Sequence, residues 1–163
     1  MNAPSSALDM TNPAPPVALR WFVTIGRLAL AAVFLFAAWT KMPWVQPPPL
    51  FGMQIDSYQI LGPGMVMLVA RTLPWFELAV GLLLLVGRPL RFATVVASLT
   101  VAGFFALVVR TYAAGLEINC GCFGPGERLG PATLVRDGAF LALSLAITAG
   151  AFWLRRRKSA SAS

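Results

Sequence analysis

The stretch FATVVASLTVAGFFALVV, residues 92–109, decides the fold because it is long, apolar and free of charged residues. A transmembrane helix needs about 20 mostly apolar residues, since the hydrocarbon core of a bilayer is about 30 Å thick. A helix also satisfies its own backbone hydrogen bonds, which lipid cannot do. The stretch therefore predicts a helix that crosses a membrane and faces lipid.

Three other apolar stretches have a similar length, and they are residues 21–39, 65–86 and 134–154. The link at 87–91 is so short that the spans on either side of it must be antiparallel neighbours. A composition of 58% hydrophobic and 12% charged residues is also unlike that of a water-soluble domain. The sequence therefore predicts an all-α protein, a four-helix transmembrane bundle.

The ends of the chain differ from this domain in composition. Residues 1–19 are rich in Pro, Ser, Ala and Asn without an apolar period, which is typical of a disordered tail. The membrane domain is expected to cover residues 20–154, and residues 155–163 form a short basic tail. Within the domain, residues 51–61 mix apolar and polar side chains and are expected to lie along the membrane surface.

The charge distribution predicts the orientation. The net charge is +7, but four of the thirteen basic residues form a run at 155–158, directly after an apolar stretch. Such a run is typical of a membrane anchor in contact with anionic lipid, which argues against a nucleic-acid partner. Basic residues are more numerous on the cytoplasmic side of membrane proteins. Eight fall on the side of the termini: Arg20, Arg27, Arg88, Arg91 and 155–158. Five fall on the other side: Lys41, Arg71, Arg110, Arg128 and Arg136.

Both termini are therefore expected to be cytoplasmic, and the connection at 113–132 should face outward. In a bacterial inner membrane the outer side is the periplasm, where disulfides form and persist.

That outward connection contains the only two cysteines, Cys120 and Cys122, with Gly121 between them and Phe123 and Gly124 after them. Cysteines two positions apart can bridge only in a tight ring, and the central glycine gives the backbone the freedom to form it. A strained disulfide is easily reduced, so the pair points to thiol–disulfide exchange. We predict Cys120 and Cys122 as the catalytic residues of a possible oxidoreductase.

Two other interpretations of the cysteines stay open. A purely structural bridge is one, although closing so small a ring constrains the unfolded chain little. Metal binding is the other. The chain has no histidine, so a zinc site is not complete, but sulfur ligands suit Cu(I). Four methionines are expected on the same side as the cysteines, where membrane-interface packing is the simpler interpretation: Met42, Met53, Met65 and Met67. No metal site is predicted.

Charged residues within the spans define two more candidate sites. Glu77 lies near the middle of the second span and should be neutral or paired, with Arg27 or Arg71 as the partner. Such a pair would fix helix packing, or it would serve a proton or a quinone head group. At the outer edge, a second, structural cluster is expected from Lys41, Arg136 and Asp137.

Several of these segments together resemble the MauE branch of the DoxX-like membrane proteins. The matching segments are Arg27 to Lys41, Tyr58 to Leu61 followed by Leu73-Pro74-Trp75-Phe76-Glu77, Gly81 to Leu85, Cys120-Gly121-Cys122-Phe123-Gly124, and Arg136-Asp137. The resemblance implies a membrane protein of methylamine metabolism. The resemblance also implies a role in maturation of the disulfide-rich small subunit of methylamine dehydrogenase, together with a thioredoxin-like partner.

Taken with the cysteines, the resemblance leads to an inner-membrane redox or maturation protein. Its expected partners are a periplasmic thioredoxin-like protein, a disulfide-containing client subunit and the lipid bilayer. The alternatives are a non-catalytic assembly factor, a Cu(I)-handling protein and a quinone-linked membrane subunit of the DoxX type. No resident cofactor is predicted, and quinone or Cu(I) is the group to test.

Overall fold

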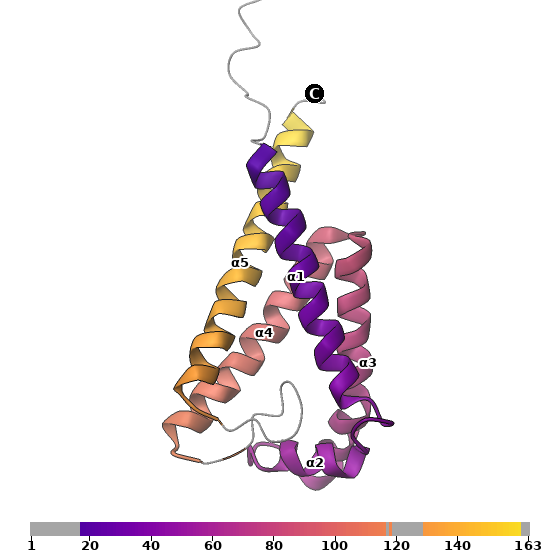
Figure 1. The fold of residues 1–163 in the computed structure, drawn as a ribbon, viewed down its shortest axis with the longest axis vertical. Helices are drawn as coiled ribbons and strands as arrows, with labels where there is room; N and C mark the ends of the chain where they lie inside the picture. Colours follow the sequence, from indigo (N-terminus) through magenta and orange to yellow (C-terminus); the bar gives the residue numbers. More distant parts are fainter. Residues whose placement is uncertain (1–16, 117, 119–128, 161–163) are drawn as a thin grey trace, which may run out of the picture.

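The computed structural model describes residues 17–116, 118 and 129–160, and this part of the chain forms five helices (Figure 1). They are α1 (Val17–Lys41), α2 (Pro48–Asp56), α3 (Pro63–Val86), α4 (Leu90–Ala113) and α5 (Pro131–Ala160). All except α2 are long and apolar enough to cross a membrane. The prediction of an all-α protein with four spans is confirmed.

The long helices extend beyond the apolar stretches that predicted them. Helix α1 begins at Val17, within the expected tail, and α5 continues through the basic run to Ala160. Hydropathy marks the part of a helix that lies in lipid, not the whole helix. Arginine and lysine are good helix formers, and their long side chains can reach the headgroups while the helix continues.

Helix α2 was not predicted as a helix, and it runs across one end of the bundle (Figure 1). Pro47 occupies its N-cap position, followed by Pro48 and Pro49 in the first turn. Proline is favoured there, because the backbone N–H that it lacks would have no partner within the helix. Phe51 and Gly52 are buried, and α2 lies against α3.

The four long helices form a closed ring in which α1 and α4 each contact both α3 and α5. The start of α1 and the end of α5 lie together at the end opposite α2 (Figure 1). The connection from α4 to α5 is attached at the same end as α2.

The half of the bundle farther from α2 is tightly packed. Its core includes Leu30 and Phe34 of α1, Leu84 of α3, Ala97 of α4 and Ile147 of α5. Small residues let the helices approach closely here, as is common between helices in membranes. The close approaches are Gly26 to Ile147, Gly81 to Leu35, and Gly150 to Val23.

Hydroxyl groups also join α4 to α5 in this half. The hydroxyls of Ser98 and Thr148 are hydrogen bonded at 2.9 Å, and the Thr148 hydroxyl lies 3.2 Å from the carbonyl oxygen of Thr94. Hydrogen bonds between helices are favourable in lipid because few competing partners exist there. These contacts fix the long helices to one another, and the cavity lined by Lys41, Glu77 and Asp137 borders this core at Phe34.

The close approach of α3 to α1 gives a stability prediction. We expect Gly81→Ala to be less stable than Gly103→Ala by about 1–3 kcal/mol, because a Cβ at Gly81 overpacks the contact. It would lie 2.9 Å from Leu35 Cγ and 3.2 Å from the Leu35 backbone nitrogen, whereas nothing lies within 4 Å of a Cβ at Gly103. Both changes gain the same helix propensity, so the difference reports the contact. Unfolding of both variants in one detergent measures it, and equal stabilities would contradict it.

Candidate functional site

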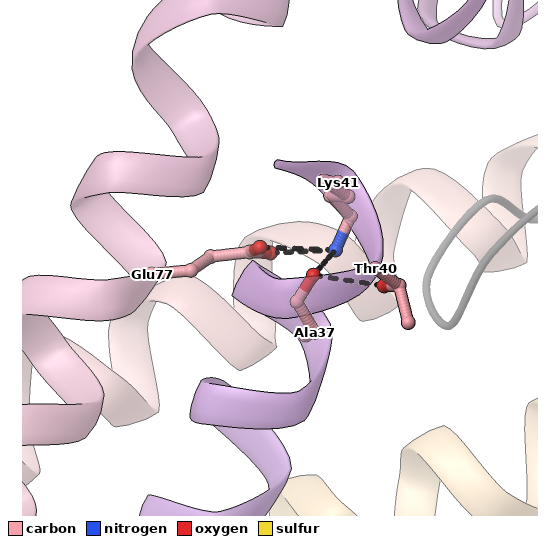
Figure 2. Close-up of polar contacts among 4 residues, drawn as sticks. All are labelled: Ala37, Thr40, Lys41 and Glu77. Atoms are coloured by element: carbon pink, nitrogen blue, oxygen red, sulfur yellow. Dashed lines mark hydrogen bonds and ion pairs between the residues drawn. The ribbon is translucent and has the colours of Figure 1, made fainter. Parts of the chain in front are cut away.

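A buried ion pair joins α1 to α3 at the C-terminal end of α1. Lys41 Nζ lies 2.9 Å from Glu77 Oε1 and 3.0 Å from Oε2, so it donates to both carboxylate oxygens (Figure 2). Only 4% of Lys41 and 3% of Glu77 is exposed. The Ala37 carbonyl oxygen accepts hydrogen bonds from Lys41 Nζ at 3.4 Å and from the Thr40 hydroxyl at 2.9 Å. The two opposite charges are therefore in direct contact and almost completely removed from solvent.

Lys41 reaches Glu77 because its side chain extends back along its own helix. Side chains in a helix tilt toward its N-terminus, so the end of a lysine lies about one turn deeper than its Cα. The contact with Ala37, four residues earlier, shows this direction. Lys41 is the last residue of α1, yet its ammonium group lies within the bundle.

The predicted partners of Glu77 are therefore wrong. Arg71 is exposed and does not pair with Glu77. Arg27 lies at the α3–α4 turn, where a Cβ on Gly87 would overlap its guanidinium group. Gly87 has a φ of 76° and its N–H donates to the Leu83 carbonyl oxygen at 2.9 Å, which ends α3. Arg27 covers this turn and does not line the cavity that contains Lys41 and Glu77.

The expected outer-edge cluster is present in part and merges with Glu77. Arg136 and Asp137 form an ion pair, with Nε and Nη2 of Arg136 each 3.0 Å from Asp137 Oδ1. Asp137 is buried and lines the same cavity as Lys41 and Glu77. Glu77 and the outer-edge cluster were expected at different depths in the membrane, but they border the same cavity.

This cavity, of about 70 Å³, lies among all four long helices. Its polar residues are Lys41, Glu77 and Asp137, and the remaining lining is apolar and largely aromatic. The aromatic residues are Phe34, Phe104, Phe105 and Phe140. A water needs about 10–15 Å³ of such volume and several polar partners, so the polar side of the cavity has room for water beside the charges.

The arrangement has two chemical consequences. Opposite charges buried together hold α1 to α3, because separating them would leave an unpaired charge in a medium of low dielectric constant. The polar side of the cavity also offers a carboxylate and an ammonium group to whatever enters it. The pair therefore fixes the bundle next to the end where the α4–α5 connection begins.

Cys120, Gly121, Cys122, Phe123 and Gly124 lie outside the described residues, but the ends of their segment do not. The Leu129 N–H donates to the Ile118 carbonyl oxygen at 2.9 Å. Before it, the Leu116 N–H lies 3.3 Å from the Thr111 carbonyl oxygen near the end of α4. A backbone hydrogen bond therefore joins Ile118 to Leu129, the two residues that flank the segment 119–128 between α4 and α5.

Residues 19–152 match the family model described as methylamine utilisation protein MauE. The match begins in α1 and ends in α5. It includes Lys41, Glu77, Asp137 and both cysteines. The chain belongs to the MauE family. No curated protein and no solved structure matched it.

Two features of this MauE protein were missed from sequence. The pairing of Lys41 with Glu77 was not predicted, and the signal for it is the position of Lys41 at the end of a span, from which a lysine reaches back. Gln46 and Gln54 each bury a side-chain oxygen with no partner in the described part of the chain, and nothing in the sequence marks them. For the Cu(I) interpretation, Met42 is buried whereas Met53 and Met65 are exposed.

Among the described residues there is no group of three His, Cys, Asp or Glu side chains that could hold a metal ion.

Proposed function

We propose that this MauE protein carries out thiol–disulfide exchange through Cys120 and Cys122 at one end of a four-span membrane bundle. One observation carries the proposal. The only two cysteines of the chain stand between Ile118 and Leu129, whose backbone groups are hydrogen bonded to each other. Both residues lie beyond the end of α4 and before α5, so the segment that contains the cysteines begins and ends at the same end of the bundle.

The exchange proceeds in two steps. A thiolate of a reduced client attacks the Cys120–Cys122 disulfide, so one protein sulfur leaves as a thiolate and a mixed disulfide forms. The client's second thiolate then attacks the mixed disulfide and releases the client in its oxidised form. Two electrons pass to Cys120 and Cys122, which become a dithiol. The disulfide of a thioredoxin-like protein takes these electrons by the same reaction and restores the starting state.

The proposed location is the inner membrane of a bacterium, with the cysteines on the periplasmic side. Eight basic residues against five support cytoplasmic termini. Four spans also leave both ends of the bundle domain on one side of the bilayer. An oxidising compartment is where an exposed cysteine pair would remain usable as a disulfide.

The proposed client is a secreted subunit that contains several disulfides. The family description refers to methylamine utilisation, and the resemblance links that role to the small subunit of methylamine dehydrogenase. A thioredoxin-like protein of the periplasm is the proposed redox partner.

Trapping a mixed disulfide tests the proposal. In cells that express either Cys120→Ser or Cys122→Ser, the variant that keeps the cysteine that attacks the disulfide of the redox partner should accumulate a covalent adduct with that partner. The adduct accumulates because the resolving sulfur of this protein is missing, and it should disappear on reduction because only a disulfide joins the two proteins. Non-reducing electrophoresis followed by mass spectrometry identifies it. If neither variant forms an adduct, a non-catalytic assembly role replaces exchange.

The orientation has its own test. A membrane-impermeant maleimide, applied to intact cells after mild reduction, should label Cys120 and Cys122. In a Cys120→Ser/Cys122→Ser background, Ser163→Cys serves as the control and should stay unlabelled until the cells are lysed. If residue 163 is labelled in intact cells, and Cys120 and Cys122 of the original chain are not, the proposed topology is inverted.

A further inference from the structure

A second cavity lies beneath α2, bounded by α2, the residues that follow it, α3 and α4. Its volume is about 160 Å³, more than twice that of the cavity at the ion pair. Its lining includes three aromatic residues, Phe51, Tyr58 and Phe104, and is otherwise almost entirely aliphatic. Phe104 also lines the ion-pair cavity, so one side chain stands between the two spaces.

The size of this cavity fits a single six-membered ring. An apolar protein cavity of about 150 Å³ remains dry and takes up benzene. Aromatic walls favour a ring further, because offset and edge-to-face contacts add to the burial of apolar surface. A charged ligand does not fit this space, since the lining has no ionisable side chain other than the phenol of Tyr58.

Gln54 adds one specific polar feature. Its side-chain oxygen is buried and has no hydrogen-bond partner in the described part of the chain, although the residue lines the cavity. A buried acceptor without a partner lowers stability, so the site favours a guest that supplies a donor. The side chain is a carboxamide, so it combines an acceptor with a donor in one group.

We propose that the cavity beneath α2 binds an uncharged, lipid-soluble compound with a single ring and a ring hydroxyl, of the phenol or quinol class. The ring lies against Phe51, Tyr58 and Phe104, and the hydroxyl donates to Gln54 Oε1. The cavity selects this class because it offers apolar walls of one-ring size and, at Gln54 Oε1, a buried acceptor without a partner among the described residues. Binding in this cavity does not involve the cysteines, so the proposal goes beyond thiol–disulfide exchange and its test is independent of that mechanism.

The probes are 4-fluorophenol and fluorobenzene, observed by fluorine NMR with the full chain in phospholipid nanodiscs. The two compounds share a ring and differ in the hydroxyl. We expect saturable binding of 4-fluorophenol above the partitioning measured in empty nanodiscs. Gln54→Leu should weaken that binding about five- to tenfold, the loss of one neutral hydrogen bond, and should leave fluorobenzene unaffected.

Gln46→Leu is the matched control. Gln46 is also buried with an unpartnered side-chain oxygen, but it does not line this cavity. It should leave the affinity for both probes unchanged. A second variant, Val69→Phe, places a ring in the cavity and should remove saturable binding of both probes, provided that circular dichroism shows the same helix content.

Two results would overturn the proposal. One is an uptake of 4-fluorophenol that equals the uptake by empty nanodiscs, because the cavity then takes no ring. The other is a Gln54→Leu variant that binds 4-fluorophenol as tightly as the original chain, because the hydroxyl then has another partner.

Discussion

Replacing Glu77 with alanine is expected to lower the free energy of unfolding by about 3–5 kcal/mol, the usual result of removing one partner of a buried ion pair. Lys41 is only 4% exposed in the original chain, and the change removes the Glu77 carboxylate that its ammonium group contacts. It also removes the main polar contact between α1 and α3, in which Lys41 Nζ lies within 3.0 Å of both Glu77 oxygens. Titration of the purified protein from mild detergent into dodecyl sulfate, followed by circular dichroism, measures the loss.

Two controls separate the ion pair from simple truncation. Combining Lys41→Met with Glu77→Leu removes both charges and keeps the volume, and this double variant should recover most of the lost stability. Thr72→Ala on the same helix removes an exposed hydroxyl that bonds only to the Leu68 carbonyl oxygen of its own helix, and should change stability by less than about 0.5 kcal/mol. If Glu77→Ala unfolds as the original protein does, the pair does not hold α1 to α3.

The four spans were predictable because one physical requirement determines them. A helix in lipid must be apolar over the thickness of the bilayer, and that requirement is visible in any window of the sequence. The ends of the helices follow a different rule. The basic run after residue 154 consists of good helix formers, so α5 continues to Ala160 although the hydropathy falls.

The ion pair was not predictable in the same way. Sequence gives the depth of each Cα, and by that measure Lys41 belongs to the edge of the bundle and Arg27 to the interior. The contact depends on the direction of a long side chain and on which helices are neighbours. Lys41 reaches inward from the end of α1, whereas Arg27 covers the turn at Gly87.

Helix α2 and the cavity beneath it illustrate a third limit. Nine residues that begin with two prolines give a weak helical signal, and the three consecutive prolines at 47–49 mark a break more plainly than a helix start. The cavity forms only where α2 lies on α3 and α4. A glutamine on a surface helix would ordinarily bond to water, so only the position of Gln54 at the cavity shows that its oxygen is buried without a partner among the described residues.

The largest functional effect is expected from the variant Cys120→Ser/Cys122→Ser, which should abolish oxidation of the client. A serine hydroxyl cannot form or break a disulfide, so neither step of the exchange remains. The fold should persist, because the bundle is held by the core around Leu30 and Leu84 and by the Lys41–Glu77 pair. In cells, the client's cysteines should stay reduced, which alkylation with a mass-tagged maleimide after acid quenching measures.

The control for this experiment is Thr72→Ala, which keeps both cysteines and should leave the client oxidised. Membrane levels of the two variants must be equal, since a lost protein would mimic a lost reaction. Each single serine variant should be as inactive as the double variant, because exchange needs both an attacking and a resolving sulfur. If the double variant still supports full oxidation of the client, the cysteines are dispensable. The protein then acts by holding its client at the membrane, and the exchange mechanism is wrong.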